Sequence, residues 1–140
     1  MSSAGSATVI CDVDGTLAIR DGRGPYDFAK VGTDQPNHDV VRLVQIIASA
    51  GLSVVYLSGR PESCRGATET WLQLHVGVPG ALFMRENGDV RSDEEVKREL
   101  LDRAVADHEE ILLVIDDRDR VVRMWRDLGL TCLQVADGNF

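Results

Sequence analysis

Two aspartates one residue apart, Asp12 and Asp14, follow a short run of β-forming residues and precede Gly15 and Thr16. Alternate side chains of a strand share a face, so both carboxylates point the same way if the strand continues through them. Two carboxylates held together repel each other unless a cation lies between them or one keeps its proton. The stretch therefore predicts either a metal-assisted carboxylate site or an acidic turn after a strand, since Asp-Gly is a common turn signal.

Other polar residues follow predicted strands at comparable positions. Ser58 follows one apolar run, Asp116 and Asp117 follow another, and Lys97 lies one turn into a predicted helix. In open parallel sheets the carboxyl ends of the strands form the rim at which ligands bind. If these strands are adjacent, we expect four carboxylates, one hydroxyl and one ammonium group to converge at a single site.

Such a group of side chains has the chemistry of phosphoryl transfer. Several carboxylates in a small space require a divalent cation, and oxygen ligands alone indicate a hard cation such as Mg²⁺. A carboxylate whose charge is screened by a metal can attack phosphorus and form an aspartyl phosphate. A second carboxylic acid can protonate the leaving oxygen and then accept a proton from water. A hydroxyl group and a lysine would neutralise the remaining phosphate oxygens.

Each of these residues also has a purely structural interpretation. Lys97 stands four residues after Asp93, which is the spacing of an exposed helical salt bridge. Ser58 suits a turn, and Asp116 and Asp117 suit the cap of the last helix. We favour the shared site because all of them occur at strand ends, or on the helix that follows, in one consistent order.

The elements that must position these groups alternate between strand and helix, which is typical of an α/β fold with a parallel sheet and helices on both of its faces. Predicted strands cover residues 8–13, 52–57, 78–84, 111–115 and 131–135. Predicted helices open near Pro36, Pro61, Ser92 and after Asp117. Ser92 also begins a capping box with Glu95 three residues later.

The connections and the core can be predicted in part. Residues 18–35 are rich in turn residues and are predicted as a loop or small hairpin that forms a flap, or lid, over the end of the first strand. Residues 58–61 are predicted as a turn that leads into a helix. Trp71, Leu72 and Leu74 are expected in the core.

Composition predicts a single globular domain over residues 1–140, with residues 1–6 as a flexible lead-in. The chain has 140 residues, of which 44% are hydrophobic and 27% charged. No apolar run approaches the roughly 18 residues that a membrane span needs, and the first residues lack the pattern of a signal peptide. We therefore expect a cytoplasmic protein with no membrane partner.

Cysteine usage and net charge argue against several kinds of site. Cys11, Cys64 and Cys132 are odd in number and irregular in spacing, which fits reduced thiols better than disulfides or a zinc site. The net charge of −8 argues against non-specific binding of nucleic acid through a broad basic face. A surplus of carboxylates suits a metal enzyme.

The motifs together resemble those of the haloacid dehalogenase (HAD) phosphatases. The residues that carry the resemblance are Asp12-Val13-Asp14-Gly15-Thr16, Ser58, Lys97 and Asp116-Asp117. The resemblance implies a three-layer Rossmann-like fold, with Asp12 as the nucleophile and Asp14 as the general acid and base. It implies Ser58 and Lys97 as phosphate ligands. It places Mg²⁺ at Asp12, Asp14, Asp116 and Asp117, with Asp117 favoured over Asp116 as a direct ligand.

Further segments carry a narrower resemblance over nearly the whole chain. They are Asp14–Ala18, Gly22–Asp27, Ser58–Arg60, Arg85–Lys97, Ile115–Arg118, Val121–Arg126 and Gln134–Phe140. They are similar to the 3′-phosphatase domain of phage-type polynucleotide kinase/3′-phosphatase. This implies removal of 3′-phosphates from DNA or RNA ends, or from 3′-nucleotides, during nucleic-acid repair. The substrate-binding residues that it implies are Thr16, Arg23, Ser58, Gly59, Arg60, Arg85, Asp93 and Lys97.

Departures from the phage enzyme limit what is expected. The sequence has no Gly-x-x-x-x-Gly-Lys-Ser/Thr phosphate loop, so we expect no 5′-kinase activity from this chain by itself. Separate kinase and ligase proteins are the expected repair partners, and a homo-oligomer stays open. The stretch 61–70 is poor in basic residues, which favours a substrate bound mainly at its terminal nucleotide.

Three other functions stay open on the sequence. The chain would also suit a HAD phosphatase for small phosphomonoesters such as nucleotides or sugar phosphates. A phospho-acceptor signalling domain uses similar residues, but its adjacent acidic pair comes early in the chain and its acceptor aspartate comes later, whereas here the order is reversed. An inactive, binding-only relative is the third, although no expected catalytic position is missing.

Overall fold

A five-stranded parallel sheet forms the centre of the protein, whose computed structural model describes residues 7–105 and 110–140. The strand order is β5-β4-β1-β6-β7, so the first strand lies in the middle. The strands are β1 (Thr8–Asp12), β4 (Ser53–Pro61), β5 (Leu82–Arg85), β6 (Ile111–Asp116) and β7 (Cys132–Gln134). The expected lead-in, residues 1–6, lies outside the described residues.

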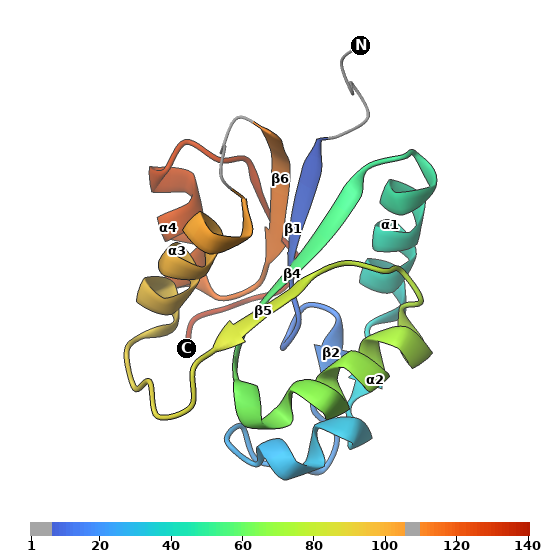
Figure 1. The fold of residues 1–140 in the computed structure, drawn as a ribbon, viewed down its shortest axis with the longest axis vertical. Helices are drawn as coiled ribbons and strands as arrows, with labels where there is room; N and C mark the ends of the chain where they lie inside the picture. Colours follow the sequence, from blue (N-terminus) through green and yellow to red (C-terminus); the bar gives the residue numbers. More distant parts are fainter. Residues whose placement is uncertain (1–6, 106–109) are drawn as a thin grey trace.

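Two helices cover each face of the sheet (Figure 1). Helices α1 (His38–Ser49) and α2 (Arg65–His75) lie on one side, and α3 (Asp93–Ala104) and α4 (Asp119–Asp127) lie on the other. Alternate residues of β1 explain the two cores: Val9 and Cys11 pack among residues of α1 and α2, whereas Ile10 packs among residues of α3 and α4. The three-layer α/β prediction is confirmed.

The register of the sheet brings the end of β1 beside its two neighbouring strands. Asp12 pairs with Leu57 of β4, and Cys11 pairs with Ile115 of β6. The residues after Asp12, Leu57 and Ile115 therefore come together at the carboxyl edge of the sheet.

We call the segment after the first strand, residues 18–36, the flap. It contains a small antiparallel pair of strands. Strand β2 (Ala18–Ile19) pairs with β3 (Gln35–Pro36), and a short 3₁₀ helix, η2 (Phe28–Thr33), lies between them. Val31 of this helix is fully buried and anchors the flap in the core. Figure 1 shows the flap at the carboxyl ends of the strands. Its movement as a lid stays a prediction.

The bounds of three elements, β4, α2 and β5, differ from those predicted. Residues 58–61 continue strand β4 instead of forming a turn, because Pro61 pairs with Arg85 of β5 after a register shift. A 3₁₀ turn, η3 (Glu62–Cys64), then precedes α2. The strand predicted at 78–84 begins only at Leu82, and a Cβ on Gly80 would collide with the carbonyl of Val54.

Leu74 and the capping box also differ from expectation. Leu74 is 75% exposed, whereas Trp71 and Leu72 are buried as predicted. Leu74 lies two residues beyond Leu72, about 200° further around the helix, and therefore points away from the core. Ser92 is the N-cap of α3, but its side chain makes no capping hydrogen bond.

Two further observations concern the cysteines and the membrane. All three cysteines are free, as the sequence predicts, and all three are buried. Among the described residues, no helix has the length and apolar character that a transmembrane helix requires.

Candidate active site

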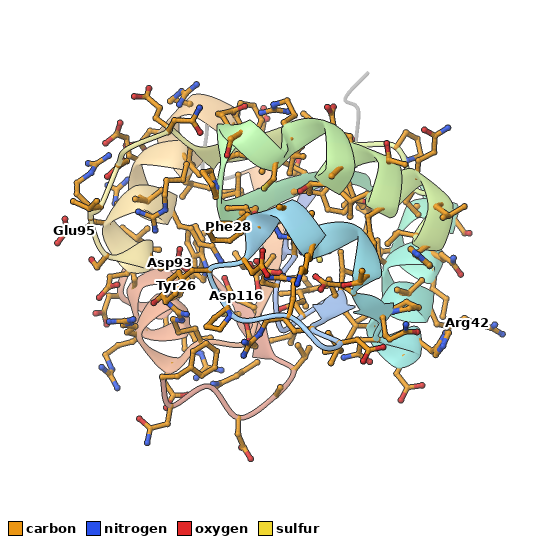
Figure 2. All side chains as sticks on the ribbon, turned by 90° about the horizontal axis from the view of Figure 1, so that it is seen from below. Tyr26, Phe28, Arg42, Asp93, Glu95 and Asp116 are labelled. Carbon is orange, nitrogen blue, oxygen red and sulfur yellow. The ribbon has the colours of Figure 1, made fainter. Side chains whose placement is uncertain are left out.

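Three carboxylates meet at the carboxyl edge of the sheet. Asp12 is the last residue of β1, Asp116 is the last residue of β6, and Asp117 follows it. One oxygen from each carboxylate lies within 4.8 Å of the others, and all three residues are buried. Figure 2 looks onto this edge and shows Asp116 in the interior, with Glu95 and Arg42 at the periphery.

Lys97 reaches the same cluster from α3. Its Nζ donates to Asp12 Oδ1 at 2.7 Å and to Asp116 Oδ2 at 3.0 Å. The side chain is 2% exposed, and Asp93 lies further away, at 3.8 Å. Lys97 is therefore the buried counter-charge of the carboxylates and not half of an exposed helical salt bridge.

Neighbouring donors fix the three carboxylates in place. Thr16 Oγ1 lies 2.8 Å from Asp12 Oδ2 and 3.3 Å from Asp117 Oδ1, and its single proton serves one of them at a time. Trp125 Nε1 donates to Asp116 Oδ2 at 3.1 Å. The sequence predicts Thr16 at the site but gives Trp125 no role beyond core packing.

The electrostatics of the cluster call for a further positive charge. Burial and the nearby charge of Asp116 raise the pKa of Asp12 well above its ordinary value. Burial alone would lower the pKa of Lys97, but the carboxylates of Asp116, Asp12 and Asp93 raise it well above its ordinary value. If Asp12, Asp116 and Asp117 are ionised and Lys97 is protonated, the sum is −3 + 1 = −2. Oxygen ligands and this deficit fit a hard divalent cation such as Mg²⁺.

Asp14 does not point into this cluster, because β1 ends at Asp12 and the chain turns at Gly15, where φ is +79°. The side chain of Asp14 is 39% exposed. It accepts hydrogen bonds from Arg60 Nη2 at 2.6 Å, from Arg60 Nε at 3.0 Å and from Arg23 Nη2 at 3.2 Å. The two aspartates therefore have separate surroundings, and only Asp12 faces the other carboxylates.

A buried aspartate outside the predicted site, Asp34, binds both Arg23 and Arg60. Arg23 Nε donates to Asp34 Oδ1 at 2.7 Å, and Arg60 Nη2 donates to Asp34 Oδ2 at 2.8 Å. The backbone carbonyl of Asp34 accepts from Trp71 Nε1 at 2.9 Å. Asp34 thus connects the flap to α2 and positions the two guanidinium groups that hold Asp14.

Replacing this residue, Asp34→Asn, is expected to lower both stability and turnover. It leaves the two buried guanidinium groups with Asp14 as their remaining carboxylate partner, which typically costs about 2–4 kcal/mol of unfolding free energy. Asp14 then loses its fixed position, and we expect kcat to fall by about tenfold or more. Urea unfolding and phosphate release measure the two effects. The control is Asp27→Asn, since the carboxylate of Asp27 forms an exposed ion pair with Lys30 at 3.5 Å; equal losses in both variants would contradict the role of Asp34.

Arg85 and Asp93 lie together beside Gly59. Arg85 Nε donates to the carbonyl of Gly59 at 2.8 Å, and Arg85 Nη2 donates to Asp93 Oδ1 at 3.3 Å. Burial raises the pKa of Asp93, but the charges of Lys97, Arg118 and Arg85 bring it below its ordinary value. A Cβ on Gly59 would collide with Asp93 Oδ1, so glycine at this position permits the close approach.

Ser58 lies behind Gly59 and is buried, with its Oγ accepting a hydrogen bond from the backbone of Arg60 at 3.1 Å. Gly15 plays a part similar to that of Gly59, because a Cβ there would collide with the carboxylate of Asp117. Two glycines therefore let carboxylates approach the backbone on either side of Asp12.

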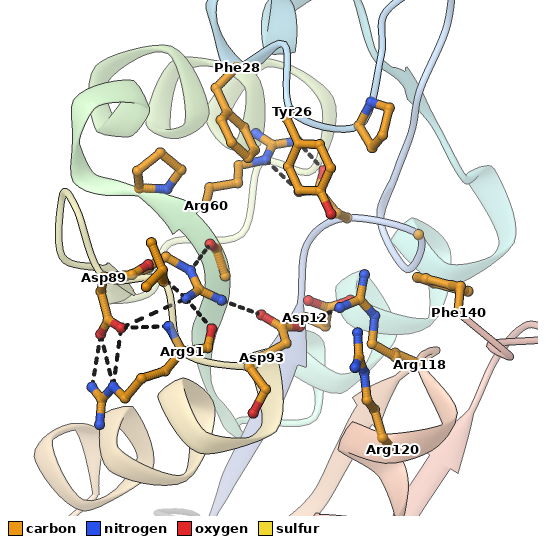
Figure 3. A pocket seen from close by; sticks show the side chains of 18 of the residues that line it. Asp12, Tyr26, Phe28, Arg60, Asp89, Arg91, Asp93, Arg118, Arg120 and Phe140 are labelled. Atoms are coloured by element: carbon orange, nitrogen blue, oxygen red, sulfur yellow. Dashed lines mark hydrogen bonds and ion pairs between the residues drawn. The ribbon is translucent and has the colours of Figure 1, made fainter.

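A cavity of about 650 Å³ opens over this edge of the sheet (Figure 3). Asp12, Asp14 and Asp117 line it, as do Gly59 and other predicted substrate-binding residues, Arg60, Arg85 and Asp93. Predicted residues that lie behind this wall are Thr16, Arg23, Ser58, Lys97 and Asp116. Arg23 in particular is buried against Asp34 and donates to Asp14, so its role in this structure is to hold the carboxylate of Asp14 in place.

Besides six acidic residues, six arginines line the cavity. They are Arg20, Arg60, Arg85, Arg91, Arg118 and Arg120. Of these, Arg20, Arg91, Arg118 and Arg120 are additions to the predicted site. Arg118 directly follows Asp116 and Asp117, which is the signal that could have identified it. Arginine binds phosphate groups through paired N–H donors, so these side chains suit a phosphate ligand.

Comparisons with known proteins agree with this geometry. The sequence model of one protein family, the polynucleotide kinase PNKP phosphatase domain, matches residues 6–140. The chain is 35% identical over 125 residues to the "Putative bifunctional polynucleotide kinase/RNA ligase" of Autographa californica nuclear polyhedrosis virus. That alignment covers 87% of this chain and 18% of the viral protein.

Solved structures give the same result for the fold. A chain of the Pnkp1/Rnl/Hen1 RNA repair complex is 34% identical, with a TM-score of 0.89, over 100% of this chain and 46% of that chain. A class C acid phosphatase from Bacillus anthracis, solved with tungstate bound, is 17% identical, with a TM-score of 0.58, over 96% of this chain and 68% of its own. The latter likeness concerns the fold alone. The chain therefore spans less than half the length of the viral relative and of the repair-complex chain.

Proposed function

Because this chain belongs to the family of polynucleotide kinase PNKP phosphatase domains, a group of HAD-type phosphatases, we propose that it removes 3′-phosphates from nucleic-acid ends. The reaction is hydrolysis of a phosphomonoester through an aspartyl phosphate on Asp12. One observation carries the proposal. Asp12 is held by Lys97 at 2.7 Å and by Thr16 at 2.8 Å, and it opens into a cavity whose wall is rich in arginine.

The residues would act in two steps. In the first, a carboxylate oxygen of Asp12 forms a bond to phosphorus, the bond from phosphorus to the 3′ oxygen breaks, and Asp14 gives that oxygen a proton. In the second, Asp14 takes a proton from water, whose oxygen attacks phosphorus and releases inorganic phosphate from Asp12. Lys97 compensates charge beside Asp12 throughout.

To donate and accept protons, Asp14 must lose some of its hydrogen bonds with Arg60 and Arg23. Arg60 and Arg23 hold its carboxylate in the present conformation. A phosphate group in the cavity would compete for Arg60, which lines the wall. We therefore propose that substrate binding draws this guanidinium group away from Asp14 and leaves the carboxyl group able to exchange protons.

Mg²⁺ would be held by Asp12, Asp116 and Asp117, whose oxygens and net charge fit it, whereas the carboxylate of Asp14, the fourth predicted ligand, is bound to Arg60. When bound, it would screen the repulsion between the Asp12 carboxylate and the phosphate dianion. We expect excess chelator to abolish phosphate release and added Mg²⁺ to restore it, whereas Zn²⁺ should restore less because the ligands are all oxygens. Full activity in chelator would contradict the metal assignment.

The relatives support a place for this domain in RNA end repair beside other activities. The viral protein is named for kinase and RNA ligase functions, and the solved relative belongs to an RNA repair complex. We propose that this domain likewise acts with a kinase and a ligase, and that RNA ends are among its substrates.

A phosphatase for small phosphomonoesters is the second candidate, and the net charge of −8 favours it because long polyanions are repelled. A substrate panel separates the two. Phosphate release is measured from a 3′-phosphorylated oligonucleotide, its 5′-phosphorylated twin, and sugar phosphates. The proposal predicts the highest kcat/KM for the 3′-phosphorylated oligonucleotide, and faster turnover of sugar phosphates would reject it.

A further inference from the structure

Exposed apolar side chains gather on the wall of the active-site cavity. Tyr26, Val90 and Phe140 are 84%, 95% and 59% exposed, and all three line the cavity beside its arginines. By contrast, the exposed Leu74 and Ile46 lie on the outer faces of α2 and α1. Apolar surface left uncovered beside charged groups is typical of a ligand-binding site. The cavity wall therefore offers both cationic and apolar contacts.

The local sequence holds Tyr26 in a fixed and uncovered position. The backbone N–H of Asp27 donates to the carbonyl of Gly24 at 3.2 Å, which closes a tight turn with Pro25 and Tyr26 at its tip. Proline fixes the backbone at the second position of that turn. Phe28 packs against the Tyr26 ring nearly perpendicular, with centroids 6.5 Å apart and an interplanar angle of 76°. The ring is thus preorganised while most of its surface stays free.

The turn is also tied to the reacting groups. Arg23 precedes Tyr26 by three residues and donates to Asp14 at 3.2 Å, so the flap segment that carries the ring is connected to the expected acid and base. Figure 3 shows the Tyr26 ring over the cavity near Arg60. A nucleotide whose phosphate reaches Asp12 would extend past these residues into the cavity.

Phe140 offers less free ring surface than Tyr26. The guanidinium group of Arg118 already lies over its ring, 4.5 Å from the centroid. The chain before it is anchored, because the N–H of Asp119 donates to the carbonyl of Gly138 at 2.9 Å. Phe140 therefore forms a fixed wall, backed by a cation, and Tyr26 is the ring that remains available for stacking.

We propose that Tyr26 stacks on the nucleobase of the terminal nucleotide whose 3′-phosphate is removed, an inference that rests on the proposed function. Every nucleobase has a π-face, so stacking selects a nucleotide over a sugar phosphate without selecting one base over another. This subsite would compensate for the shortage of basic residues at 61–70, since affinity comes from the last nucleotide.

The test uses two 3′-phosphorylated oligonucleotides that differ only in whether the terminal nucleotide carries its base or is abasic, each in ribo and deoxyribo form. For the unmodified chain with Mg²⁺, we expect kcat/KM to be about tenfold higher when the base is present. Tyr26→Ala should bring this ratio close to one, and Tyr26→Phe should keep it. Leu74→Ala is the matched control for loss of an exposed apolar side chain and should leave the ratio unchanged.

The outcomes separate this inference from the function on which it rests. A ratio near one in the unmodified chain, or an equal loss on both substrates in Tyr26→Ala, would overturn the stacking role while phosphate release from 3′ ends continues. Failure of the unmodified chain to release phosphate from either oligonucleotide would overturn the proposed function itself, and the inference with it.

Discussion

Asp12→Asn is expected to reduce phosphate release by at least about 1,000-fold while the chain stays folded. An amide oxygen is a poor nucleophile and cannot form the aspartyl phosphate, so the first step has no acceptor. The asparagine side chain has nearly the same shape and can still accept from Lys97 or Thr16. Steady-state phosphate release and circular dichroism measure the two properties.

Although Asp12→Asn should lose activity, we expect it not to lose stability. The pKa of Asp12 is raised by burial and by Asp116, so the folded state disfavours the carboxylate. Because the pKa of Asp12 is higher in the folded state, the unfolding free energy decreases as the pH rises from the ordinary pKa of an aspartate to the raised one. An asparagine does not ionise, so the variant does not show this decrease. In chelator at pH 7, Asp12→Asn should therefore be at least as stable as the unmodified chain. Clear destabilisation, or substantial activity, would contradict the role of Asp12.

Lys97→Met is expected to have the largest effect on stability. Lys97 is the buried cation between Asp12 and Asp116, and its loss leaves three close carboxylates without a counter-charge. Removing one partner of a buried ion pair costs about 3–5 kcal/mol of unfolding free energy. Activity should be lost as well, because the ammonium group is adjacent to the nucleophile.

Divalent cations provide the control for this prediction. Mg²⁺ would supply part of the missing positive charge, so the Lys97→Met variant should gain more stability from Mg²⁺ than the unmodified chain does. Lys30→Met removes a lysine that is 61% exposed and should change stability by less than about 0.5 kcal/mol. A Lys97→Met variant as stable as Lys30→Met in chelator would contradict the charge balance described for the site.

The convergence of the main site could be predicted because parallel strands end at one edge. Asp12 and Asp116 each close a buried strand, and the neighbouring positions of β1 and β6 follow from the α/β alternation. Lys97 is predictable for the same reason, since its helix returns over that edge. The positions of these residues therefore follow from the regular geometry of a parallel α/β sheet, which the sequence pattern predicts.

The arrangement around Asp14 could not be predicted because it depends on irregular backbone. Gly15 breaks the alternation of β1 at once, so the shared face expected for Asp12 and Asp14 does not exist. Asp34 lies in a turn-rich segment without periodicity, and only the folded flap brings it to Arg23 and Arg60. The extension of β4 to Pro61 likewise arises from pairing with a distant strand.

Residues of the cavity wall were partly missed for a different reason. Tyr26 and Arg120 look like ordinary surface residues in the sequence, since exposed aromatic and charged side chains are common. Only the cavity shows that they face the same space as Asp12. Such binding residues do not recur at a fixed spacing in the sequence, so no local sequence pattern identifies them.

Transfer of the phosphoryl group to Asp12 tests the central claim most directly. The chain is mixed with Mg²⁺ and an oligonucleotide labelled with ³²P at its 3′-phosphate, quenched in acid within milliseconds, and digested to locate the label. The prediction is transient label on the peptide that contains Asp12, none in Asp12→Asn, and little from the 5′-labelled twin. Label on a different residue, or equal transfer from both ends, would contradict the proposed mechanism and substrate.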